Sequence, residues 1–373
     1  MSKLTAEMSR RHALQLGACA GGLALFGYPA RVSADDIPVQ PDTGTVTILT
    51  WETYQDDAPV ADYAKKAGVE VKVIRAGSVD EMYAQTRSGA IKPDVIYFDT
   101  GSIPRYILAD LVEPINFARV PNIKNIMPSL DWQKFNFMNN AVYGIPYCWG
   151  TQPLMYDADK MPEPKSWGAL WDPKFQGKVS TFDDAYVNMP MIALYCKVKD
   201  PYNLSDADFE TVSDALRALR PQIRAIATGY DDMASKFMAG DAEIAYCQNI
   251  SIGNDLRGRG RNVQVTYPVE GTPAWVDNAV LTKGSGQRNE VYNFINHCLS
   301  LEWQARFISE HGGNGVISEA DARANGVSDG VIEKTEIRSA VDPNFWARMS
   351  VLQTPENFDK RLEIWNAFKA GTL

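Results

Sequence analysis

Apolar and polar positions near the start of the chain follow two patterns in turn. Three short segments are rich in β-forming residues, which predicts strands at 46–51, 70–75 and 94–98. The segments 58–67 and 80–88 predict helices, and a glycine follows each of them. Strands that alternate with helices predict a parallel sheet covered by helices, with ligands bound beyond the carboxyl ends of the strands.

The rest of the chain continues this pattern. Ser205 and Asp208 form a capping box, which predicts a helix that ends at Pro221. Trp275 and Asp277 are expected in a loop that follows a strand. The other predicted elements are strands at 143–151, 178–182, 243–247 and 263–268, and helices at 231–239, 289–310 and 356–370.

The beginning of the chain has the features of an export signal. Arg10 and Arg11 precede an apolar run at 13–26, and small residues follow at 32–34. This order predicts a cleaved signal peptide of the twin-arginine type over residues 1–34, and a protein located in the periplasm. The apolar run is too short and too rich in glycine to span a membrane.

Two features leave the export route and the anchoring open. Ala13 stands where twin-arginine signals commonly have phenylalanine, so the general secretory route is an alternative. The segment 16–19 resembles a lipobox, but the apolar stretch before Cys19 is short for a signal, so we favour cleavage over a lipoprotein. Residues 35–44 are polar and contain prolines, which predicts an unstructured leader.

Composition narrows the class of protein. Removal of the signal leaves 373 − 34 = 339 residues, more than one core usually covers, which predicts two lobes. These residues carry 37 − 4 = 33 basic and 46 − 1 = 45 acidic side chains, a net charge of −12. An acidic chain does not suit nucleic-acid binding. The one basic cluster, at 257–261, contains two glycines and is expected to be a solvated loop.

Cysteine and histidine usage indicates neither a metal site nor an enzyme. The cysteines after the signal match no metal-ligand spacing, so we expect no metal and no other cofactor. The sequence does not determine whether or how they pair; they are Cys148, Cys196, Cys247 and Cys298. No hydrolase or nucleotide-binding motif is present. The alternative is an exported enzyme that uses Cys148 or Cys247 with His311, although buried structural cysteines are the simpler interpretation.

Several short motifs recur in a fixed order across nearly all of the chain after the signal. They are LTWETY at 49–54, DVI at 94–96, YGIPYCWG at 143–150, SWGALWDPKFQGK at 166–178, DDA at 183–185, WVD at 275–277 and the predicted helix at 291–310 followed by Gly312 and Gly313. Together they resemble the polyamine (spermidine/putrescine) branch of the periplasmic solute-binding proteins of ABC importers. The segment 166–178 is the most specific of these motifs.

The resemblance implies an α/β protein with the two-lobed periplasmic binding protein fold of type II, in which the ligand lies in a cleft between the lobes. The chain should cross between lobes near 149–151 and again just before Trp275. A monomer is expected, which binds a small cationic ligand and delivers it to an inner-membrane ABC permease. The implied lobes are residues 45–150 plus about 276–316, and residues 151–275 plus about 317–373.

The resemblance also implies ligand-binding residues at the ends of strands. Trp275 and Asp277 match an aromatic platform and a carboxylate that pairs with an amine, at the family's spacing. Asp184 matches a second such carboxylate, although a helix N-cap would explain it equally. The full set of candidates is Trp51, Glu52, Tyr54, Asp99, Thr100, Asp184, Tyr246, Trp275 and Asp277.

The sequence departs from the family pattern at several of these places. One acidic and three aromatic residues of the family are replaced, at Val187, Gly101, Cys247 and Gly313. We therefore expect a wider and less apolar cleft, in which Glu52 and Asp99 add carboxylates that disfavour an anionic ligand. The predicted function is the capture of a cationic amine, a polyamine or a related compound, and the alternative ligand is a larger opine-like or amino-acid conjugate.

Overall fold

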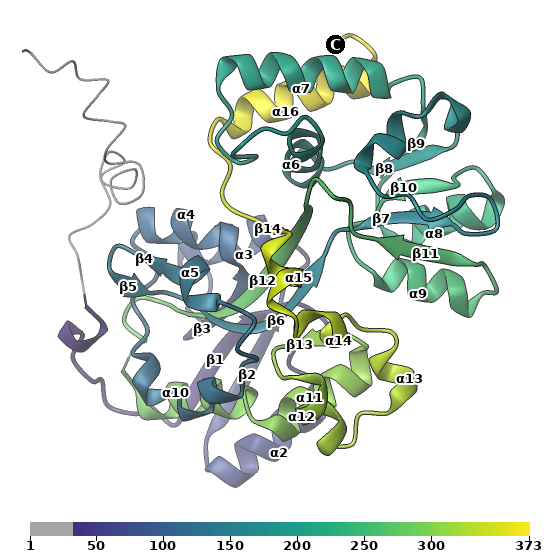
Figure 1. Cartoon of the computed structure of the whole chain (residues 1–373). Coiled ribbons are helices and arrows are strands. Elements are labelled where there is room, and N and C mark those ends of the chain that lie inside the picture. Colours follow the sequence, from purple (N-terminus) through teal and green to yellow (C-terminus); the bar gives the residue numbers. More distant parts are fainter. Residues whose placement is uncertain (1–32, 286) are drawn as a thin grey trace, which may run out of the picture.

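The computed structural model describes residues 33–373 except residue 286, and these form two α/β lobes (Figure 1). The predicted signal peptide lies outside the described residues, apart from Ser33 and Ala34. Within the described part of the chain, no helix has the length and apolar character needed to cross a membrane.

The first lobe is built on a mixed sheet of seven strands. Its β1, β2 and β3 are parallel, as the strand–helix alternation predicts, but β12 runs antiparallel to both β3 and β6. The strand order is β13 (Asn314–Gly315), β6 (Ile145–Thr151), β12 (Thr272–Leu281), β3 (Val95–Asp99), β1 (Thr45–Thr50) and β2 (Glu70–Arg75), with β14 (Met349–Val351) beside β12.

The first two helices of the first lobe end where the sequence predicts. The helices α2 (Asp57–Ala67) and α3 (Val79–Ser88) are each followed by a glycine, Gly68 and Gly89, in the left-handed conformation that favours this residue. The other elements between β3 and β6 are α4 (Ile103–Leu108), α5 (Trp132–Asn136), β4 (Phe137–Met138) and β5 (Ala141–Val142).

The second lobe has a five-stranded sheet. The predicted capping box is confirmed, because Ser205 Oγ accepts the N–H of Asp208 and Asp208 accepts the N–H of Ser205. The strand order is β11 (Val263–Thr266), β7 (Leu154–Asp157), β10 (Ile244–Tyr246), β8 (Val179–Phe182) and β9 (Ile223–Ala227), and the helices are α6 (Ala185–Tyr195), α7 (Asp206–Leu219), α8 (Tyr230–Ala239), α9 (Ser251–Gly258) and α16 (Phe358–Ala370). Of these helices, α6, α7 and α16 are drawn at the top of Figure 1, and α8 and α9 at its right.

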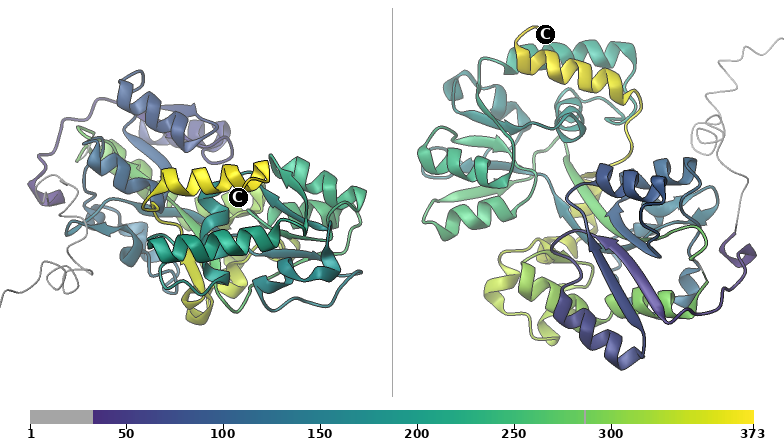
Figure 2. Two further views of the ribbon diagram at one scale, coloured as in Figure 1. Left: turned by 90° about the horizontal axis from the view of Figure 1, so that it is seen from above. Right: turned by 180° about the vertical axis from the view of Figure 1, so that it is seen from behind.

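Three short segments connect the lobes, at 152–153, 267–271 and 352–357. The position of the third segment differs from the expectation, in which all of 317–373 belongs to the second lobe. Ile337 and Trp346 belong to the same buried cluster as the first sheet, whereas Trp365 of α16 packs in the core of the second lobe. The views in Figure 2 agree with this grouping, because only the last helix lies against the second lobe. The helices that move to the first lobe are α12 (Glu319–Ala324), α13 (Asp329–Ile332), α14 (Ile337–Ala340) and α15 (Pro343–Ala347).

Two expectations about secondary structure are wrong. Trp275 and Asp277 lie inside β12 and not in a loop, because β12 pairs with a strand on each side. The single helix expected at 289–310 is two helices, α10 (Asn289–Cys298) and α11 (Leu301–His311), because Ser300 between them caps α11 by accepting the N–H of Trp303 at 3.2 Å.

The basic cluster at 257–261 begins in the last turn of α9, so it is only partly a loop. Its arginines are engaged within the protein: Arg257 donates to the carbonyl of Val263, and Arg259 pairs with Asp255. Arg261 pairs with the buried Asp157 at 2.9 Å.

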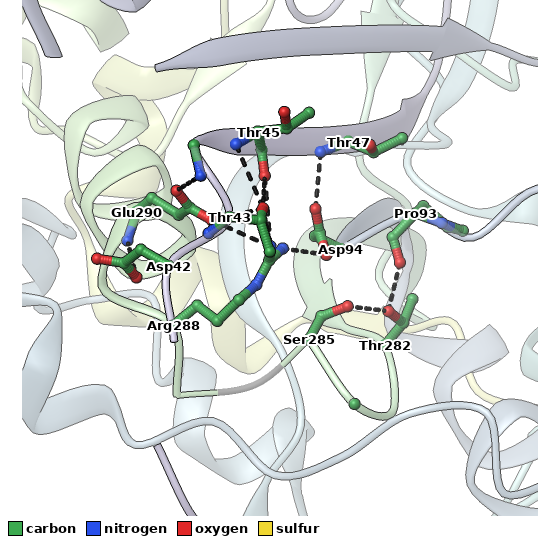
Figure 3. Close-up of polar contacts among 12 residues, drawn as sticks. Asp42, Thr43, Thr45, Thr47, Pro93, Asp94, Thr282, Ser285, Arg288 and Glu290 are labelled. Carbon is green, nitrogen blue, oxygen red and sulfur yellow. Dashed lines mark hydrogen bonds and ion pairs between the residues drawn. The ribbon is translucent and has the colours of Figure 1, made fainter. Parts of the chain in front are cut away.

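The leader at 35–44 is attached to the first lobe and is not unstructured. The backbone N–H groups of Thr43 and Gly44 donate to the carboxylate of Glu290 at 2.7 and 2.8 Å. Arg288 donates to Thr43 Oγ1 at 2.6 Å and also pairs with Glu290 (Figure 3). A polar segment therefore holds a fixed path because side chains of the loop before α10 and of its first turn satisfy its backbone groups.

Candidate ligand-binding site

Two buried carboxylates lie side by side at the carboxyl end of the first sheet. Asp99 is the last residue of β3, and the antiparallel register pairs it directly with Asp277 of β12. Directly opposed residues on antiparallel strands have Cβ atoms about 4.5–5.5 Å apart. Asp99 is 8% exposed and Asp277 is 6% exposed. The structure therefore brings together two acidic residues that are 178 positions apart in the chain.

Neither carboxylate forms an ion pair with a Lys, Arg or His among the described residues. Arg105 lies near Asp99 but pairs with Asp80. Burial, followed by the charge of Asp99, raises the pKa of Asp277 to about 7. Burial also raises the pKa of Asp99. Two buried acidic groups without a cation are costly to ionise, so this site favours a positively charged ligand.

Aromatic side chains stand beside these carboxylates. The Tyr54 hydroxyl donates to Asp277 Oδ2 at 2.5 Å. The half-buried Trp51 follows β1, and its buried Nε1 has no hydrogen-bond partner. Trp275 lies opposite Gly150 of β6, and a Cβ atom at Gly150 would overlap the indole ring. Glycine at this position thus allows the ring to lie flat over the strand.

A small cavity next to Trp275 has walls from both lobes. Its volume is about 40 Å³, which suits water molecules and not an organic ligand. It is lined by residues of β6 and β12, of the segment 312–314 in the first lobe, and of the second lobe. They are Trp149, Gly150, Thr151, Asn249, Ile250, Trp275, Gly312, Gly313 and Asn314. Of the nine candidate residues, only Trp275 lines this cavity.

Asp184 lies in the second lobe as the N-cap of α6. Its Oδ1 accepts the N–H of Tyr186 at 2.9 Å, and Gln248 donates to its Oδ2 at 3.3 Å. Burial raises the pKa of this carboxyl group, and these hydrogen bonds oppose that change. The N-cap interpretation is confirmed, and a role in amine binding stays a prediction.

Three other candidates are placed differently. Glu52 is exposed. Thr100 is buried and donates to the carbonyl of Val276 while it accepts from Asn278. Tyr246 is fully buried, and its hydroxyl donates to Gln152 at 2.6 Å. Thr100 and Tyr246 therefore serve the internal hydrogen-bond network in this structure.

The expectation of a wider cleft is wrong at two of the substituted positions. A Cβ atom at Gly101 would overlap the hydroxyl of Tyr186, and one at Gly313 would lie 3.0 Å from the ring of Phe307. The space left by the glycines is thus filled by aromatic rings from elsewhere in the chain. Tyr186 is not among the residues predicted from the sequence. Its position in the first helical turn after the capping residue Asp184 is the feature that could have indicated it.

Among the described residues, no hydrogen bond joins the thiol of Cys148 or Cys247 to His311. All four described cysteines are free, and burial raises the pKa of Cys148 well above its usual value and that of Cys247 to about 12. His311 Nε2 lies 2.7 Å from Asp56 Oδ2 instead. Glu310 adds a third possible metal ligand beside this pair, although the ordinary His–carboxylate contact already explains it.

Comparison with known proteins identifies the family. The family described as "Bacterial extracellular solute-binding protein" matches residues 58–334. The chain belongs to this family. The "Spermidine/putrescine-binding periplasmic protein" of Escherichia coli is 25% identical to this solute-binding protein over 296 residues, which cover 78% of this chain and 79% of that one.

Solved structures confirm the two-lobed fold. A "Spermidine/Putrescine ABC Transporter Substrate-Binding Protein" from Streptococcus pneumoniae is similar with a TM-score of 0.75 at 21% identity, and the match covers 88% of this chain and 99% of that chain. A binding protein from A. tumefaciens in complex with glucopine is similar with a TM-score of 0.62 at 15% identity, covering 87% and 99%. The fold therefore occurs with more than one class of ligand.

Proposed function

We propose that this protein is the periplasmic solute-binding component of an ABC importer and that it captures a cationic amine, a polyamine or a related compound. The observation that carries this proposal is the pair Asp99 and Asp277, two buried carboxylates in register that form no ion pair with a Lys, Arg or His of residues 33–285 and 287–373. The names of its relatives point to the same ligand class.

The energetics favour an ammonium group at this place. A hydrogen bond between an ammonium group and a carboxylate contributes about 1.5–3 kcal/mol. A cation–π contact with Trp275 or Trp51 contributes about 0.5–2 kcal/mol more. In the free protein, the cost of burying two negative charges raises the pKa of both Asp99 and Asp277. A bound ammonium group would remove this cost.

Capture of a ligand requires the lobes to separate, because Asp99 and Asp277 are buried and Tyr186 of the second lobe contacts Asp99. The three linkers at 152–153, 267–271 and 352–357 are short, and a rotation about them would open the cleft as a hinge. We propose that a monomer closes on its ligand and presents it to an inner-membrane permease. We also propose that the signal peptide at 1–34 directs this monomer to the periplasm, without a lipid anchor.

A screen by thermal shift tests the proposal. The purified protein is mixed with polyamines, monoamines, amino acids and opine-like conjugates, and we expect saturable stabilisation by the amines. The variant Asp277→Ala should weaken that stabilisation, whereas Asp214→Ala, on an exposed face of α7, should leave it unchanged. No response to any cationic amine would reject the ligand class, and it would leave the family and the fold as they stand.

A further inference from the structure

The protein itself already satisfies two of the three carboxylates in the cleft. Asp99 Oδ2 accepts from Ser102 Oγ at 2.7 Å, and its Oδ1 accepts from the Tyr186 hydroxyl at 3.1 Å. Asp184 accepts from the N–H of Tyr186 on one oxygen and from Gln248 on the other. An ammonium group would have to compete with these donors at either residue.

Asp277 differs from both. Its Oδ2 accepts from Tyr54, and no hydrogen bond from the described residues ends on its Oδ1. The buried indole N–H of Trp51 faces Asp277 and lowers the pKa of its carboxyl group without forming a hydrogen bond of good geometry, and Trp275 precedes Asp277 by two positions on the same face of β12. Asp277 therefore accepts fewer hydrogen bonds than the other two carboxylates, and its aromatic neighbours suit the alkyl part and the charge of an amine.

Tyr186 links the two lobes at the other carboxylate. It belongs to the first turn of α6 in the second lobe, and its hydroxyl meets Asp99 at the end of β3 in the first lobe. The contact needs glycine at position 101, because a Cβ atom there would overlap the hydroxyl oxygen. Tyr186 thus fills the space beside Asp99 from the opposite wall of the cleft.

We propose that the cleft selects ligands that present a single ammonium group to Asp277, and that Tyr186 sets this selectivity by occupying Asp99. The inference rests on the proposed function and narrows its ligand class. The expected ligands are amines that carry one ammonium group and no second positive charge in need of a carboxylate. Tyr186 has this effect because its hydroxyl donates to Asp99 and its ring fills space in the cleft.

The test compares butylamine with butane-1,4-diamine, which has the same carbon chain and one more ammonium group. Calorimetric titration at pH 8 gives the two Kd values for the wild type, Tyr186→Phe and Tyr186→Ala. In the wild type the second ammonium group stays in solvent, so the Kd values should differ by less than about fivefold. Both variants release Asp99, so the diamine should then bind at least about tenfold more tightly than butylamine.

A second interlobe contact supplies the matched control. Asn254 of α9 donates to the carbonyl of Lys334 in the first lobe at 2.8 Å. Asn254→Ala should therefore change lobe closure and shift both Kd values by the same factor. A wild type that prefers the diamine by tenfold or more, or an Asn254→Ala variant that alters the ratio as the Tyr186 variants do, would overturn the inference. Binding of neither amine by the wild type, together with no response to any cationic amine in the thermal-shift screen, would instead reject the proposed function.

Discussion

Replacement of Asp277 by asparagine should stabilise the protein at high pH. Burial and the neighbouring Asp99 raise the pKa of Asp277 from 3.8 to about 7 in the folded chain. The folded state therefore holds a proton that the unfolded state loses above about pH 4, so the stability linked to this proton is present at low pH and is lost as the pH rises through 7. A shift of about three pKa units corresponds to about 4 kcal/mol.

Urea unfolding followed by tryptophan fluorescence from pH 4 to pH 8 measures this effect. The difference in unfolding free energy between Asp277→Asn and the wild type should rise in favour of the variant by about 4 kcal/mol across this range. Asp214→Asn, whose side chain is 75% exposed, should show a constant difference. A difference for Asp277→Asn that stays within about 1 kcal/mol at every pH would refute the reasoning that Asp277 is ionised at a high cost.

Three further predictions concern binding and the hinge. Because Asp277 must be ionised to pair with an ammonium group and its pKa is about 7, amine affinity should fall by about 30-fold between pH 8 and pH 5.5, and a flat calorimetric profile would exclude this carboxylate as the partner. Gly150→Ala should displace the Trp275 ring and weaken amine binding by roughly 2- to 30-fold, so an unchanged Kd would remove Trp275 from the site. Glu336 is buried and accepts from Thr151, Tyr267 and Asn314, beside the linkers at 152–153 and 267–271. Glu336→Ala should therefore lower the unfolding free energy by at least about 3 kcal/mol, and an unchanged Tm would contradict this role.

Local patterns in the sequence predicted the first strands and helices of the chain to within about one residue, namely β1, β2, β3, α2 and α3. The helix that ends at Gly68 and the capping box at Ser205 depend on neighbouring residues, so a short window of sequence contains the information. Wrong expectations arose where distant residues decide the outcome. Trp275 and Asp277 lie in a strand because β12 pairs with two strands that precede it by more than 100 positions.

The candidate site was predicted in part for the same reason. The resemblance pointed to Asp99 and Asp277 separately, but only the register between β3 and β12 makes them a directly opposed pair. Tyr186 was missed because its contact with Asp99 depends on how the second lobe faces the first. The third linker was misplaced because the polar helices α12 to α15 contribute few apolar residues each, and their packing on the first lobe has no local signature.

The central claim is that the cleft binds a cationic amine, with Asp277 as the carboxylate that pairs with it. Titration of the purified protein at pH 8 with butane-1,4-diamine and with butane-1,4-diol tests it most directly, because the two compounds share a carbon chain and differ in charge. We predict saturable binding of the diamine, its loss in Asp277→Ala, and no measurable binding of the diol. Equal binding of the two compounds, or binding of the diamine that Asp277→Ala leaves unchanged, would contradict the claim.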